Sequence, residues 1–132
     1  MAQLTADTQR DYELGDMADL PVDAAVVIYA GSAVGLNSGN ARQLVAADPF
    51  GGFATEKADN ASGSAGDITV NVKTKGKIVL TVAGSPAINA AVYASDGATF
   101  TTVSTSNTKI GFIKSASGSD WVVEFDSTLV LQ

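Results

Sequence analysis

Two carboxylates near aromatic residues are the first candidates for chemistry in this sequence. Asp48 and Glu56 flank the stretch FGGF at residues 50–53, and an apolar ring beside a carboxyl group is one way to raise its pKa for acid/base work. Carboxylates in turns and on strand faces are more commonly solvated. The pattern therefore favours a structural role for both. An enzyme with paired carboxylates, such as a glycosidase, ranks third among the function classes, because it needs a cleft that so small a protein rarely provides.

Two other patterns could bind an ion or a phosphate. Asp120 and Asp126 flank the apolar stretch 121–125, but no EF-hand pattern or second ligand cluster accompanies them, so they are interpreted as strand-end charges and no metal is predicted. The glycines of Gly31-Ser32-Ala33-Val34-Gly35 lack the Lys-Ser/Thr of a P-loop and the spacing of a dinucleotide fingerprint. A hairpin is the favoured interpretation, and no cofactor is predicted.

The sequence contains neither His nor Cys. Without His there is no Ser-His-Asp or Cys-His arrangement, and without Cys there is no thiolate metal site or disulfide framework. Most hydrolase classes are therefore excluded, and no enzymatic activity is predicted.

The sequence pattern predicts that short strands position these residues. The Gly-Gly pair predicts a turn over residues 48–52 that leads into a strand starting near Phe53. Apolar and polar residues alternate over residues 68–82, which predicts a hairpin that turns at residues 74–77. Further strands are expected at 24–31, on both sides of 37–40, on both sides of Asp96-Gly97, and at 109–114 and 121–125.

The composition agrees with this pattern. The 132 residues suffice for one domain, 45% of them are hydrophobic, and only 17% are charged. About ten short strands without a convincing helix predict an all-β fold, a single antiparallel β-barrel or β-sandwich with an extended N-terminal arm. Residues 1–22 form the predicted arm, because their apolar residues follow no regular period, and residues 23–132 form the β-domain.

The negative charge is concentrated at the N-terminus. Residues 1–25 hold six acidic residues against Arg10 alone, which gives −5 of the total net charge of −6. An acidic chain without a basic stripe argues against direct binding of nucleic acid. No apolar run reaches the length of a membrane span, and no signal-peptide pattern follows Met1, so we expect synthesis in the cytoplasm of the producing cell and no membrane partner.

Four segments within residues 26–123 form a recognisable order: DPFGGFATEK, GDITVNVKTKGKIVLTVAG, VYASDGATFT and TKIGFI. In the order of these segments, the chain resembles the capsid cement, or head decoration, proteins of tailed bacteriophages. DPFGGFATEK is similar to that family's D-P-F-x-G-F-A-x-E-K passage, and VYASDGATFT is similar to its V-Y-A-S-D turn.

This resemblance implies a structural virion protein that binds the outer capsid surface and stabilises the expanded shell. The implied partner is the major capsid protein, with self-association as a homotrimer at local threefold positions and a dimer as the second choice. For Phe50 and Phe53 a place in the core is favoured over an interface, because exposed Phe is costly. The candidates for capsid or subunit contacts are Leu4, Tyr12, Leu14, Met17, Phe50 and Phe53.

The alternative function is a carbohydrate-binding or adhesive β-module displayed on a particle or cell surface. Trp121 and Tyr93 could stack on sugar rings, and Asp96 could accept hydrogen bonds from hydroxyl groups. A buried Trp121 on an alternating strand is the simpler explanation.

Overall fold

The computed structural model of the chain describes residue 6 and residues 16–127. This part of the chain contains thirteen strands and no helix, and nearly all strand pairs are antiparallel. The predicted all-β class is confirmed. No helix among these residues is long and apolar enough to span a membrane.

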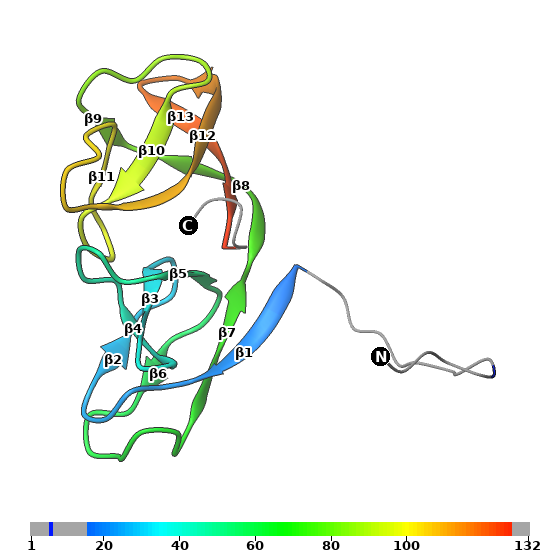
Figure 1. Cartoon of the computed structure of the whole chain (residues 1–132), viewed down its shortest axis with the longest axis vertical. Helices are drawn as coiled ribbons and strands as arrows, with labels where there is room; N and C mark the ends of the chain where they lie inside the picture. Colours follow the sequence, from blue (N-terminus) through cyan, green and yellow to red (C-terminus); the bar gives the residue numbers. More distant parts are fainter. Residues whose placement is uncertain (1–5, 7–15, 128–132) are drawn as a thin grey trace.

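Two sheets make up most of the fold, and they lie at opposite ends of the molecule (Figure 1). The five-stranded sheet has the order β1 (Met17–Pro21), β7 (Thr69–Lys73), β5 (Phe50–Ala54), β3 (Ala33–Asn37) and β4 (Asn40–Gln43). The six-stranded sheet has the order β8 (Lys75–Leu80), β13 (Asp120–Asp126), β12 (Thr108–Ser117), β10 (Ala91–Ala94), β11 (Phe100–Thr101) and β9 (Val82–Ala83). A separate short pair joins β2 (Val27–Ile28) and β6 (Ala58–Asp59).

Side chains on the strands of the five-stranded sheet point alternately to its two faces, and its apolar residues therefore belong to two separate cores. Val34 and Ala54 pack with Val70 and Val72 in one cluster, which the β2–β6 pair also joins. The neighbouring residues Ala33 and Phe53 belong instead to the core of the six-stranded sheet. Successive side chains on a strand point to opposite faces, so the same strands contribute to both cores and tie the two sheets together.

The segment 68–82 holds β7, β8 and the first residue of β9, and the two main strands β7 and β8 do not pair with each other. β7 pairs with β1 and β5, whereas β8 pairs with β13 in the other sheet. The predicted hairpin is therefore wrong. Residue 74 is the point where the chain passes from one sheet to the other, and β7 and β8 follow one another along one side of the molecule (Figure 1). The predicted buried face is correct, since Val70, Val72, Leu80 and Val82 are all buried.

The Gly-Gly pair lies within a strand and does not form a turn before one. β5 starts at Phe50, and its register against β3 shifts by one residue at Gly51–Gly52, which is a β-bulge. Gly52 has φ of +119°, so the expectation of a backbone angle that favours glycine is met at this residue.

Part of the predicted arm belongs to the sheet. Residues 17–21 form the edge strand β1, and Ala18 and Leu20 pack against the core that contains Val70 and Val72. The sequence pattern missed this strand because an edge strand with one half-buried face carries little apolar periodicity. Residues 1–5 and 7–15 of the arm lie outside the described residues.

Candidate interaction surfaces

Both oxygens of the Asp48 carboxylate accept hydrogen bonds from other residues of the protein. Arg42 donates to it with two nitrogens, Nε to Oδ2 at 3.0 Å and Nη2 to Oδ1 at 2.8 Å. The backbone N–H of Val45 also donates to Oδ2 at 3.0 Å, and the hydroxyl of Thr108 donates to the Asp48 carbonyl at 2.7 Å. A side chain at Gly35 would overlap this carboxylate, so glycine is needed there. Asp48 thus connects the β4–β5 loop to β12.

These bonds decide the protonation state of Asp48. Burial alone would raise the pKa of its carboxyl group, but the hydrogen bonds from Arg42 and Val45 outweigh it and hold the pKa below its usual range. A general acid at neutral pH needs a raised pKa, so the lowered pKa does not suit Asp48 to that task, and its contacts with Arg42 and Val45 agree with the favoured interpretation of a structural role.

Replacing Asp48 with Asn should destabilise the fold by about 1 to 3 kcal/mol, because Arg42 loses its charged partner but is itself partly exposed. A lowered folded-state pKa means that the ionised group stabilises the fold above about pH 4, and that this contribution is lost as the pH falls through the folded-state pKa. Urea unfolding from pH 7 to pH 2 should therefore show a smaller acid loss in Asp48→Asn than in the parent. Glu124→Gln, on an exposed strand position, is the control, and an equal acid loss in Asp48→Asn and the parent would contradict this role.

The other predicted carboxylates do not assemble into a site. Asp48 precedes β5 and Glu56 follows it, and Glu56 accepts a hydrogen bond from the backbone of Asn71. Asp120 and Asp126 lie at opposite ends of β13, where Asp120 accepts from the Thr81 hydroxyl. Among the described residues there is no group of three or more acidic, His or Cys side chains that could hold a metal ion.

The proposed sugar-binding set is not brought together either. Tyr93 lies opposite Lys109 and Trp121 lies opposite Ala116, which puts them seven residues, or roughly 23 Å, apart along β12. Trp121 packs against the core, whereas Tyr93 alternates with the buried residues Val92 and Ala94 and so faces outward.

The Asp96 carboxylate accepts its hydrogen bonds from residues of its own turn. It accepts hydrogen bonds from the backbone N–H of Ala98 and from the hydroxyl of Thr99. The bond from Ala98 is the main cause of a lowered pKa for this carboxyl group. The residues that motivated the carbohydrate hypothesis therefore do not form a binding site.

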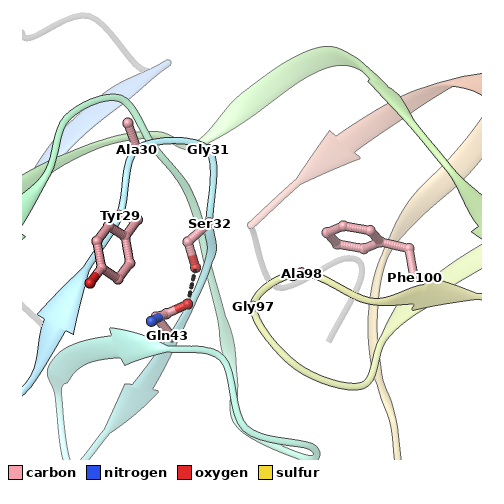
Figure 2. Close-up of a pocket in the computed structure, with 8 residues that line it drawn as sticks. All are labelled: Tyr29, Ala30, Gly31, Ser32, Gln43, Gly97, Ala98 and Phe100. Atoms are coloured by element: carbon pink, nitrogen blue, oxygen red, sulfur yellow. Dashed lines mark hydrogen bonds between the residues drawn. The ribbon is translucent and has the colours of Figure 1, made fainter.

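A shallow pocket of about 320 Å³ lies between the loop that follows β2 and the turn that precedes β11 (Figure 2). Ser32 donates a hydrogen bond of 3.4 Å to the side-chain oxygen of Gln43, and Phe100 lines the other side. The lining residues carry no carboxylate or amine. The lining of this pocket is therefore neutral and mostly apolar.

Two exposed apolar residues are associated with this pocket. Tyr29 in its lining is 54% exposed. Val45 is 50% exposed and forms an isolated bridge with Asp96, next to the pocket residue Gly97. We name Tyr29, Val45 and the pocket lining the pocket surface. The sequence pattern does not single out this surface, because Tyr29 falls within the strand expected at 24–31 and Val45 follows residues 37–40, and neither pattern reports which of these side chains is exposed.

The structure separates the predicted interface candidates. Phe50 and Phe53 are 2% and 4% exposed and lie in the core, as the favoured interpretation had it, so they offer no surface to a partner. Their selection as contact residues is corrected accordingly. Met17, on the outward side of β1, is 38% exposed. Leu4, Tyr12 and Leu14 lie outside the described residues.

Comparison with known proteins gives one structural likeness. No protein-family model matches the chain, and no curated protein matches it. A solved structure described as "The capsid of Myoviridae Phage XM1" contains a chain with a TM-score of 0.54 and 19% sequence identity. The match covers 96% of this chain and 98% of that one. At this identity the comparison establishes a shared fold over nearly the whole length of both chains.

Proposed function

We propose that this chain is a structural protein of a tailed-phage virion, which binds the outer surface of the capsid and stabilises the expanded shell. The observation that carries the proposal is the shared fold with a chain from a phage capsid, since the match leaves almost no part of either chain unpaired. A capsid-binding role also suits a small β-protein whose best-placed carboxylates, Asp48 and Asp96, are held in internal hydrogen bonds.

A protein of this kind needs only binding free energy that is present in the assembled lattice and absent from separate capsid subunits. The partner is the major capsid protein, and a homotrimer at local threefold positions lets several modest contacts act together through a high effective concentration. Preferential binding to the expanded form then stabilises that form by mass action. A dimer would work by the same principle with fewer contacts.

The pocket surface is the best candidate for one of these contacts. Tyr29 combines an apolar ring with a hydroxyl, as residues at protein interfaces commonly do, and the nearby Lys57 ammonium lies 5.3 Å from the centre of that ring. The pocket beside it can accept a protruding side chain. Met17 on the edge strand β1 supplies a second exposed apolar site.

Heat-induced release of packaged DNA tests the stabilising role. Expanded heads that lack the chain are compared with the same heads saturated with it, and the saturated heads should release DNA at a temperature several degrees higher. Tyr29→Ala at the same protein concentration should give a smaller increase, because it removes an exposed ring from the pocket surface. Ile88→Ala serves as the matched control, since Ile88 is exposed to a similar extent but is not part of the pocket surface. Identical release temperatures with and without the chain would contradict the proposal.

A further inference from the structure

Asp96 and Gly97 form the single Asp-Gly pair of the sequence, which has no Asn-Gly pair. In an Asp-Gly pair the glycine has no side chain to hinder its amide nitrogen, which can attack the carboxyl carbon of the preceding Asp. The product is a succinimide, and its hydrolysis can leave the peptide bond on the side chain of the Asp, which is then an isoaspartate. The sequence therefore contains one position that is predisposed to this modification.

The fold favours glycine at position 97, which is buried. A Cβ there would lie 2.6 Å from Oγ of Ser32 and 3.0 Å from Oε1 of Gln43. The Ser32 hydroxyl cannot readily move away, because it is buried and donates to the carbonyl of Ala33 at 3.0 Å. The carbonyl of Gly97 also accepts from the N–H of Ala33 at 2.9 Å. Because of this packing, a bulkier and less reactive residue does not fit after Asp96.

The turn stabilises the ionised carboxylate of Asp96. Oδ1 accepts from the N–H of Ala98 at 2.8 Å, and Oδ2 accepts from the hydroxyl of Thr99 at 3.2 Å. The N–H of Ser95 donates to the carbonyl of Thr99 at 3.0 Å, which closes the turn. Attack by the Gly97 nitrogen needs the neutral carboxyl group, because an ionised carboxylate is a poor electrophile. The two bonds to the carboxylate favour the ionised form and restrict its rotation, and both effects slow the attack.

Isomerisation at this position would change the pocket surface. Gly97 and Ala98 lie on one side of the pocket, and Tyr29 lies on the other (Figure 2). Asp96 also forms the isolated bridge with Val45. An isoaspartate adds one carbon atom to the main chain between Asp96 and Gly97, so the longer chain would shift this wall of the pocket and disturb the bridge.

We propose that Asp96 is a modification site, at which the turn formed with Ala98 and Thr99 slows isoaspartate formation while the protein is folded. The Gly97 nitrogen forms a bond to Cγ of Asp96, and one carboxyl oxygen leaves as water with the carboxyl proton and the amide proton. Water then opens the succinimide at the former α-carbonyl, so that the Gly97 nitrogen stays bonded to Cγ. The modification does not depend on the proposed capsid role.

Incubation of the full chain near neutral pH tests the proposal, with folded protein compared with protein kept unfolded in guanidinium chloride. Isoaspartate is measured on the tryptic peptide 78–109, in which Asp96 is the single Asp residue. Deamidation of Asn89 or Asn107 changes the mass of this peptide, whereas isomerisation of Asp96 does not. The unfolded chain should form isoaspartate at least about tenfold faster, because it lacks the bonds of the turn. Equal rates in both samples, or no isoaspartate in the unfolded chain, would overturn the proposal.

A substitution within the folded protein tests the role of the turn. Thr99→Val keeps the shape of the side chain but removes the hydroxyl that donates to Asp96, so isoaspartate should form at least about threefold faster than in the folded parent. Thr101→Val is the matched control, since the Thr101 hydroxyl accepts from the N–H of Val103. Its rate should equal that of the parent. Circular dichroism checks that both variants are folded, and a parent-like rate in folded Thr99→Val would overturn the role of this bond.

Discussion

Replacing Phe53 with Ala should destabilise the protein by about 3 to 5 kcal/mol, the usual cost of removing a buried Phe side chain. The ring of Phe53 lies at the centre of an aromatic cluster, with its centroid 4.8 Å from that of Phe125, 5.6 Å from that of Phe50 and 5.9 Å from that of Phe100. These partners come from both sheets, so the substitution leaves a cavity where the sheets join.

Denaturant unfolding of Phe53→Ala measures this cost, and Phe112→Ala is the matched control. Phe112 is only half-buried, on the outer face of the six-stranded sheet with the Lys109 ammonium 4.6 Å from its ring centre. Its removal should cost about 1 kcal/mol, because little apolar surface returns to water. An equal loss of stability in the two variants would mean that Phe53 is not a core residue.

Gly52→Ala should cost about 2 to 5 kcal/mol, from two separate causes. The φ of +119° is unfavourable for any residue with a Cβ, and a Cβ at this position would overlap the backbone carbonyl of Lys73 on β7. Because that carbonyl belongs to the backbone of the neighbouring strand β7, the clash cannot be relieved by a side-chain movement.

The control for this substitution is Gly39→Ala in the turn between β3 and β4. Gly39 also has a positive φ, +84°, but nothing lies within 4 Å of the added Cβ, so only the backbone strain of about 1 kcal/mol is expected. The difference between the two unfolding free energies isolates the contact with Lys73. If Gly52→Ala were as mild as Gly39→Ala, the β-bulge in β5 would not be as tightly packed as described.

The sequence predicts local features of this fold well. Strands on both sides of Asn37–Asn40 and of Asp96-Gly97 form as expected, because a tight turn and its two strands are encoded within about ten residues. The buried face of residues 68–82 is also correct, since alternation reports which side chains are apolar. The same pattern carries no information on pairing partners. β8 pairs with β13, more than forty residues away in the sequence, so the hairpin prediction fails for a non-local reason.

The candidate surfaces were harder to predict for a related reason. Exposure of Tyr29 and Val45 depends on how the loop after β2 meets the turn at Asp96, and these segments lie far apart in the sequence. By contrast, the structural roles of Asp48, Asp120 and Phe53 were predictable, because carboxylates in turns and at strand ends are commonly structural and Phe side chains are commonly buried. The composition alone shows that the sequence has no His and no Cys, and therefore which catalytic and metal-binding arrangements it lacks.

The most direct test of the proposed function is selective binding to assembled shells. Purified protein is sedimented with expanded heads, with unexpanded heads and with separate major capsid subunits of the phage whose genome encodes it. We expect saturable binding to expanded heads, with affinity at least about tenfold higher than for the other two forms, because the contacts act together only in the expanded lattice. Equal affinity for expanded heads and for separate subunits, or no binding to expanded heads, would contradict it.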